Sequence, residues 1–82
     1  MEFMREIGIY QKDGAKLIGS VPIDIAKTKL IEIFSIDTEE DPNALKVYNI
    51  SEEQYLQLSV LVPALLSYKF DNVEMFCESF QA

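Results

Sequence analysis

The last part of the chain carries the strongest constraint, a run of alternating side chains from Tyr68 to Phe80. Successive side chains of a strand point to opposite faces of its sheet, so residues two apart share a face. One set contains Val73, Met75 and Cys77, an apolar row typical of a face that packs on a core. The other set mixes phenylalanines with glutamates and is typical of a partly wet face: Phe70, Asn72, Glu74, Phe76, Glu78 and Phe80. The run therefore predicts an amphipathic strand on which shorter upstream elements can pack.

The N-terminal part of the chain predicts a β-hairpin. Phe3 to Gln11 alternates loosely and contains two β-branched isoleucines, which favour a strand. Asp13-Gly14 follows, and Asp-Gly between two strand-like runs favours a tight turn because glycine takes positive φ without steric strain. We expect the return strand from Lys16 to Val21. Pro22 should close it, since proline has no N–H to donate to a sheet.

A first helix is expected after this hairpin, from Ile25 to about Phe34. Asp24 is the expected N-cap, because its carboxylate can accept hydrogen bonds from the unpaired N–H groups of a first helical turn. Apolar side chains recur at helical spacing and would face the core. These residues are Ala26, Leu30, Ile33 and Phe34.

A second helix is expected to begin at Glu52. Ser51 to Gln54 forms a capping box, in which the serine hydroxyl accepts from the glutamine N–H and the glutamine side chain reaches back to the serine N–H. Its main apolar stripe is formed by four residues: Tyr55, Leu56, Ser59 and Val60. Pro63 must end this helix, kink it or begin a new turn.

The order of elements predicts the fold class. Lys46 to Ile50 is typical of a short strand, so the expected order is strand, strand, helix, strand, helix, strand. This order predicts a single small α+β domain over residues 1–82, with an antiparallel or mixed four-stranded sheet and both helices packed on one face.

The chain is acidic and lacks histidine. Its 82 residues include 14 Asp and Glu against 7 Lys and Arg, for a net charge of −7. Such a charge is unsuited to nucleic acid or an anionic membrane and suits a basic surface, although it also keeps a small protein soluble. Without histidine, the commonest general base and metal ligand are absent. The single cysteine, Cys77, falls in the apolar row. We therefore expect no catalysis, no cofactor and no metal.

The expected location is the cytoplasm. The N-terminus lacks the basic segment and apolar run of a signal peptide. The longest apolar run, from Val60 to Leu66, is far shorter than the roughly 20 residues that span a bilayer. A small domain with a single cysteine also suits a reducing compartment.

Three stretches are candidates for contact with a partner. Four carboxylates fall within five residues, where repulsion favours a solvated loop: Asp37, Glu39, Glu40 and Asp41. This loop either contacts a basic partner or is merely solvated, and it lacks the ligand spacing of a calcium loop. Glu74, Phe76 and Glu78 would form a second acidic and aromatic surface, unless they are ordinary solvent-facing strand residues. The apolar run from Leu56 to Leu66 is either core or the face of a homodimer.

Four segments together carry a family resemblance: Ile9 to Gly14, Phe34 with the loop Asp37 to Asp41, Tyr48 to Gln54, and Asp71 with Met75 to Glu78. In these segments the chain is similar to a family of short bacterial domains. Some members of that family resemble immunity proteins encoded beside secreted toxins, including those of contact-dependent growth inhibition. The stretch from Leu56 to Tyr68 is more apolar than the family pattern.

The resemblance implies an immunity protein that binds and neutralises a cognate secreted toxin in the cytoplasm, as a 1:1 complex. Such toxins are often nucleases, of tRNase or RNase type, with a basic groove for phosphates that an acidic protein can cover. The expected contact residues are Asp37, Glu39, Glu40, Asp41, Glu74, Phe76 and Glu78. The alternative is a small structural or regulatory homodimer that pairs through Leu56 to Leu66 and has no toxin partner.

Overall fold

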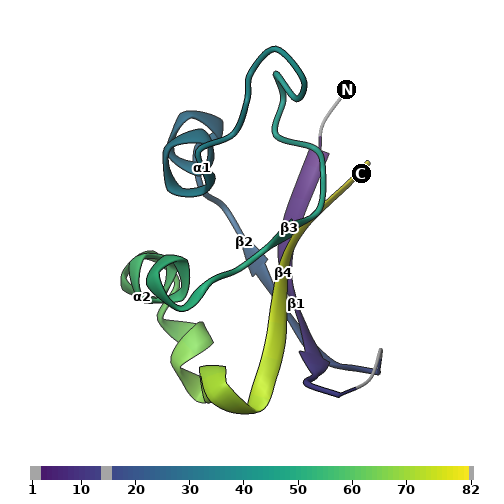
Figure 1. Cartoon of the computed structure of the whole chain (residues 1–82), viewed down its shortest axis with the longest axis vertical. Coiled ribbons are helices and arrows are strands. Elements are labelled where there is room, and N and C mark those ends of the chain that lie inside the picture. The colour runs from purple at the N-terminus through teal and green to yellow at the C-terminus, as the bar shows by residue number, and fades with distance from the viewer. Residues whose placement is uncertain (1–2, 14–15, 82) are drawn as a thin grey trace.

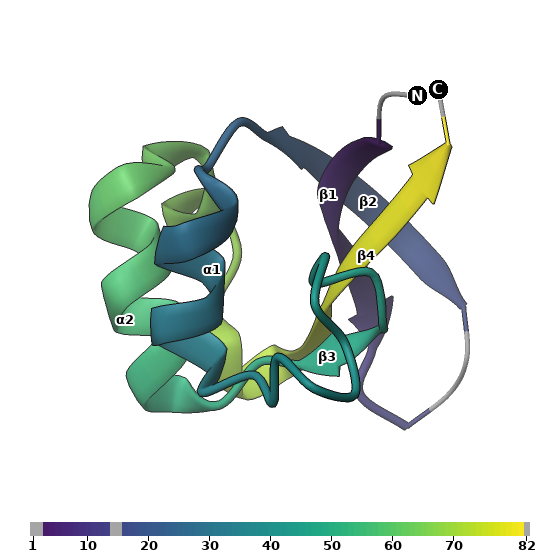
Figure 2. The same cartoon turned by 90° about the horizontal axis from the view of Figure 1, so that it is seen from above.

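A computed structural model describes residues 3–13 and 16–81 of the chain. It contains a four-stranded antiparallel sheet in the order β2-β1-β4-β3, with helices α1 and α2 on one of its faces (Figures 1 and 2). The elements are β1 (Phe3–Gln11), β2 (Leu17–Ile23), α1 (Lys27–Phe34), β3 (Tyr48–Asn49), α2 (Glu52–Leu61), the 3₁₀ helices η1 (Pro63–Ser67) and η2 (Phe70–Asn72), and β4 (Val73–Gln81). The α+β class and the order of strands and helices are confirmed, and the sheet is antiparallel rather than mixed.

The two longest strands, β1 and β4, lie side by side at the centre of the sheet. They pair antiparallel over nine residues, from Phe3 opposite Gln81 to Gln11 opposite Val73. The apolar row predicted for the last strand is buried, with Met75 at 1 % exposure. It packs with Ile7 and Ile9 of β1, which are fully buried, and with the inner sides of α1 and α2.

The last strand begins later than its alternation suggests. Phe70 and Asn72 belong to η2 and do not extend the face formed by Glu74 and Phe76. A hydrogen bond from the Asn72 N–H to the Lys69 carbonyl closes this short turn. The Phe70 ring packs instead against a tyrosine of α2, at 5.2 Å between ring centroids.

The expected end of the hairpin and the expected start of the first helix are wrong, whereas α1 ends at Phe34 as predicted. β2 continues through Pro22 to Ile23, because β2 is an edge strand and a proline is tolerated there when its missing N–H faces away from the sheet. The extended backbone persists to Ala26, which takes ψ 140° and makes no side-chain cap, so α1 begins at Lys27. Asp24 is therefore not the N-cap, and Ala26 is exposed rather than buried.

The core residues predicted for the first helix, and the pairing predicted for the hairpin, agree with the structure except at Ala26. Leu30 and Ile33 are buried as expected, and Phe34 is half-buried against the core. β1 and β2 pair as a hairpin, and the turn residues 14–15 lie outside the described part of the chain.

The second helix begins as predicted and buries a different stripe. The capping box is present: the Ser51 hydroxyl accepts from the Gln54 N–H at 3.2 Å, and the Gln54 side chain accepts from the Ser51 N–H at 2.9 Å. The helix ends at Leu61, and Pro63 begins η1. The buried residues are Tyr55, Leu58 and Ser59, whereas Leu56 and Val60 are exposed. The stripe prediction is thus half right, because the sheet lies against the Leu58 side of the helix.

The third strand is shorter than expected, since only Tyr48 and Asn49 pair with β4. Ile50 is buried just beyond it, and Val47 just before it is exposed. Within the described ranges, no helix has the length and apolar character needed to cross a membrane.

Candidate partner-binding surfaces

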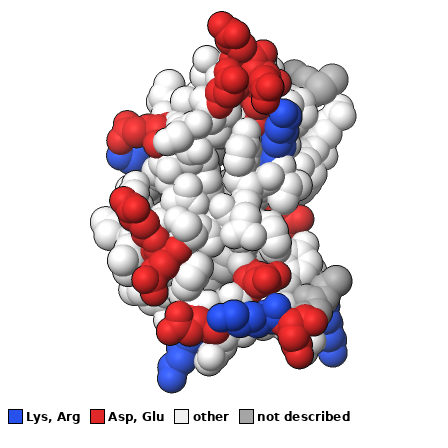
Figure 3. Space-filling view, viewed as in Figure 1, with Lys and Arg blue, Asp and Glu red and all other residues white. Residues whose placement is uncertain are grey.

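The acidic loop, residues Asp37 to Asp41, connects α1 to the segment before β3. Figure 3 shows carboxylates gathered at the end of the molecule that this loop forms. Asp37, Glu39 and Glu40 are exposed there. Within the described residues, one ion pair forms at this loop, between Glu40 and Lys46 at 3.7 Å. Because both side chains are exposed, the pair adds little to the stability of the fold.

Asp41 differs from its neighbours because it is buried, with 6 % of its surface exposed. Its carboxylate accepts hydrogen bonds from the N–H groups of Leu45 and Lys46, at 2.9 and 3.1 Å, and from the Tyr48 hydroxyl at 2.6 Å. The prediction of four solvated carboxylates is therefore wrong for Asp41. The physical reason is that the loop turns back on itself, with Ala44 at φ 54°, and brings three donors onto one carboxylate.

The Asp41–Tyr48 pair shifts the pKa values of both groups. Burial alone would raise the pKa of Asp41, but the hydrogen bonds from Tyr48, Leu45 and Lys46 outweigh it and lower the pKa below its ordinary value. Burial and the adjacent Asp41 carboxylate raise the pKa of Tyr48 to about 12. At neutral pH Asp41 is therefore ionised and the Tyr48 hydroxyl is protonated. In this state the hydroxyl donates to the carboxylate and links the loop to β3.

The second predicted surface is the outer face, the side of the sheet on which no helix lies (Figure 2). Strand alternation and pairing register place these side chains on it: Met4, Glu6, Gly8, Tyr10, Ser20, Pro22, Asn49, Glu74, Phe76, Glu78 and Phe80. Glu74, Phe76 and Glu78 are brought together as the alternation of β4 predicts. The predicted contact residues include none from β1. The β1 residues of this face are revealed only by the register of β1 against β4.

Tyr10 and Glu78 form the centre of the outer face. The Tyr10 hydroxyl lies 3.1 Å from both carboxylate oxygens of Glu78. Burial, followed by the bond to Glu78 and the nearby Glu6, raises the pKa of Tyr10. The Tyr10 ring also contacts Phe76 edge to face, with centroids 5.5 Å apart and planes at 81°. Gly8 lies beneath the pair, and a Cβ added there would collide with the Glu78 carboxylate.

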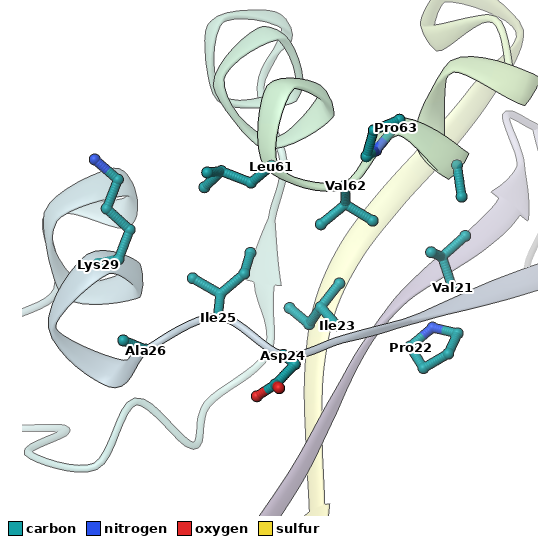
Figure 4. Close-up of a pocket in the computed structure, with 11 residues that line it drawn as sticks. Val21, Pro22, Ile23, Asp24, Ile25, Ala26, Lys29, Leu61, Val62 and Pro63 are labelled. Carbon is teal, nitrogen blue, oxygen red and sulfur yellow. The ribbon is translucent and has the colours of Figure 1, made fainter.

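The third feature is an apolar groove between two connections on the helical side of the molecule. It has a volume of about 690 Å³ and is lined by Val21 to Ala26 with Lys29, and by Leu61 to Ala64 across from them. Figure 4 shows Ile25 and Val62 pointing toward each other across this groove. Exposed apolar side chains continue from it along α2 and η1: Leu56, Val60, Leu61 and Leu66. The predicted apolar run is therefore partly core, at Leu58 and Leu65, and partly surface.

Groups suited to catalysis are scarce in the described residues. Burial raises the pKa of the Cys77 thiol to about 11, so the thiol stays protonated and unreactive at neutral pH. Between residues 3–13 and 16–81, no group of three or more Asp, Glu or Cys side chains is placed to hold a metal ion.

Comparison with protein families gives one match. Residues 4–78 match a domain of unknown function, DUF7683, and this match covers most of the chain. The chain belongs to the DUF7683 family. Comparison with curated proteins gives no match. Comparison with solved structures gives none either. The DUF7683 description names no partner, so the nature of a partner has to be argued from the surfaces of the domain.

Proposed function

We propose that this DUF7683 domain is an immunity protein, which binds a cognate secreted toxin in the cytoplasm and neutralises it without catalysis of its own. The observation that carries the proposal is the excess of exposed carboxylates. The net charge is −7, and the acidic loop presents Asp37, Glu39 and Glu40 with one weak ion pair among the described residues. The kind of partner is suggested by the sequence resemblance to short bacterial domains, some of which resemble immunity proteins.

A nuclease toxin suits this charge because its active site must hold phosphates. Lys and Arg line such grooves, and an acidic protein can occupy the groove in place of the nucleic acid. Opposite charges also accelerate encounter, which matters for an inhibitor that must act before its toxin does. The toxin is therefore proposed as a basic nuclease domain, of tRNase or RNase type, held in a 1:1 complex.

The first test is co-purification. The tagged protein is expressed with the neighbouring upstream open reading frame, and the eluate is examined for one complex. We expect a 1:1 complex that dissociates as salt rises and that abolishes toxicity of the neighbour. A neighbour that is neither toxic nor bound would contradict the proposal.

The role of the acidic loop needs variants that keep the fold. Charge reversal at Asp41 would break its three hydrogen bonds, so the informative pair is Glu39→Lys with Glu40→Lys, both at exposed positions. The matched control reverses two exposed charges outside the loop, Asp13→Lys just after β1 with Asp71→Lys in η2. We expect loss of protection only in the loop variant. Equal protection by both variants would show that the loop is not the contact.

A second candidate function is a homodimer with no toxin partner, which the exposed apolar side chains favour. Leu56, Val60 and Leu66 are 58 %, 79 % and 64 % exposed, and they lie on connected elements. Light scattering at micromolar concentration, with and without Val60→Glu, tests this candidate. A mass of one chain in both samples contradicts it, whereas a dimer that Val60→Glu dissociates supports it.

A further inference from the structure

The elements that the structure describes leave the outer face of the sheet open. Both helices lie on the opposite face (Figure 2), and the pairing register places Ser20, Gly8, Phe76 and Asn49 in one row across all four strands of the open face. A sheet face of a small domain that no element covers, and that carries large apolar side chains, is a common site of protein contact.

The apolar part of this face is aromatic and accessible. Phe80 is 44 % exposed and lies opposite Met4, which is 50 % exposed. Beyond the Glu6–Glu78 pair on the same face, the rings of Tyr10 and Phe76 meet edge to face. Aromatic and methionine side chains of this kind are enriched in the centres of protein interfaces.

The charged part of this face has one sign. Glu6, Glu74 and Glu78 project from β1 and β4, and no Lys or Arg is among the outward side chains of the strand residues that the structure describes. Glu6 and Glu78 face each other directly in the β1–β4 register. Like charges in directly opposed positions destabilise a sheet. A cation bound near these two carboxylates would be attracted by both.

The Glu78 carboxylate is held in place and still has capacity to bind. It leans over the bare backbone of Gly8 to the Tyr10 hydroxyl, which has a single hydrogen to donate. A carboxylate can accept about four hydrogen bonds. Tyr10 therefore sets the orientation of the carboxylate, and the described residues leave most of its accepting positions unused.

We propose that the outer face binds an arginine side chain of a basic protein partner, with the guanidinium bridging Glu78 and Glu6 against the rings of Phe76 and Tyr10. Arginine fits better than lysine because its planar fork of five donors can bond two carboxylates while its flat face stacks on an aromatic ring. This inference rests on the proposed function for the identity of the partner, and it names the side chain by which that partner is held.

The partner would dock on the face and not on an edge of the sheet. Addition of a strand needs a row of free N–H and C=O groups. At the β2 edge, Pro22 has no N–H to offer, and at the other edge β3 contains only Tyr48 and Asn49. The free row at the β2 edge is limited to Leu17 to Val21 before Pro22, and β3 is two residues long, so we place the partner on the outer face, whose side chains span all four strands.

The first test uses hexa-arginine and hexa-lysine as probes, titrated into the ¹⁵N-labelled full chain at low salt. We expect hexa-arginine to bind roughly tenfold more tightly than hexa-lysine, since a bidentate guanidinium adds charge-assisted bonds. The largest shifts should fall on amides of Gly8, Phe76 and Glu78. Glu78→Gln should abolish most of the preference, while Glu39→Gln should keep it. Equal affinity for the two peptides, or largest shifts in the acidic loop, would overturn the inference.

A second measurement separates recognition from a structural role. Glu6→Gln removes the repulsion with Glu78, so we expect it to raise the melting temperature and at the same time to weaken hexa-arginine binding several-fold. A purely structural glutamate would not show opposite effects on stability and binding. An increase in both, or a loss of both, would contradict the proposed role of Glu6.

The inference and the proposed function can fail separately. If the upstream neighbour forms a complex that Glu78→Gln and Phe76→Ala leave unchanged, the immunity function stands and the arginine contact is wrong. If the neighbour does not bind but hexa-arginine binds the outer face, the proposed toxin partner is wrong and the proposed recognition of arginine stands.

Discussion

Two tyrosine–carboxylate pairs in this molecule have the same chemistry and different surroundings. Asp41 is buried and accepts from Tyr48 at 2.6 Å and from two backbone N–H groups. Glu78 is only half-buried and accepts from Tyr10 alone among the described residues, at 3.1 Å. Both tyrosines have a raised pKa, to about 12 for Tyr48, because each is partly buried beside a carboxylate.

The difference lies in how much of each carboxylate the protein itself uses. At Asp41 three donors satisfy a buried charge, which is the condition under which a buried carboxylate is tolerated. At Glu78 a single donor orients the group and leaves it accessible. We therefore assign Asp41 to the fold and propose Glu78 for contact with a partner.

Removing Asp41 should give the largest loss of stability. Asp41→Ala leaves the N–H groups of Leu45 and Lys46 and the Tyr48 hydroxyl without their acceptor, and we expect a loss of about 3 kcal/mol in the free energy of unfolding. Urea denaturation measures it. The control Glu39→Ala, at an exposed position in the same loop, should change stability by less than about 0.5 kcal/mol. Similar losses in the two variants would show that Asp41 is not a structural carboxylate.

Removing the two phenol hydroxyls tests the comparison directly. Tyr48→Phe deletes one of three donors to a buried charge, and we expect it to cost about 1–2 kcal/mol. Tyr10→Phe deletes a bond on the open outer face, and we expect no change in the denaturation midpoint beyond experimental error. If Tyr10→Phe proves as destabilising as Tyr48→Phe, the outer pair belongs to the fold and the distinction between the pairs fails.

The features that sequence predicted correctly depend on neighbouring residues. The alternation of Val73, Met75 and Cys77 predicts a buried face because strand geometry repeats every two residues, and those residues are buried. The capping box predicts the start of α2 because all its bonds form within Ser51 to Gln54. The order of elements follows from such local signals.

The features that the sequence did not reveal depend on how the chain pairs or turns back in space, over 68 positions in one case and over four to seven in another. The pairing of Tyr10 with Glu78 spans 68 positions and exists only in the β1–β4 register. The burial of Asp41 requires the loop to return its backbone N–H groups and Tyr48 to the same carboxylate. Asp24 was misplaced as a cap because the edge position of β2, which tolerates Pro22, follows from sheet order and not from local pattern.

Acid should weaken the structural pair. Hydrogen bonds hold the pKa of Asp41 below its ordinary value of 3.8. Its contribution to stability is therefore complete above that value and is lost as pH falls through the lower pKa of the folded state. We expect the stability difference between the native protein and Asp41→Asn to shrink as pH falls from about 5 to about 3, in denaturation measured across that range. A difference that stays constant or grows would show that the charge of Asp41 is not what its donors stabilise.

Gly8→Ala should have a modest effect on stability and a clear effect on the outer pair. The added Cβ would collide with the Glu78 carboxylate and lie 2.8 Å from the Tyr10 ring, so the two side chains must separate. Because the Glu78 end is flexible and partly exposed, we expect a loss of no more than about 1 kcal/mol. Phenolate absorbance should show the pKa of Tyr10 falling toward 10.0, since its bond to Glu78 contributes to the raised value. Binding of hexa-arginine should weaken as in Glu78→Gln, because an unoriented carboxylate must lose freedom on binding. If Gly8→Ala instead unfolds the sheet while leaving Tyr10 unchanged, Gly8 serves strand packing, and the Tyr10–Glu78 pair does not depend on the space it leaves.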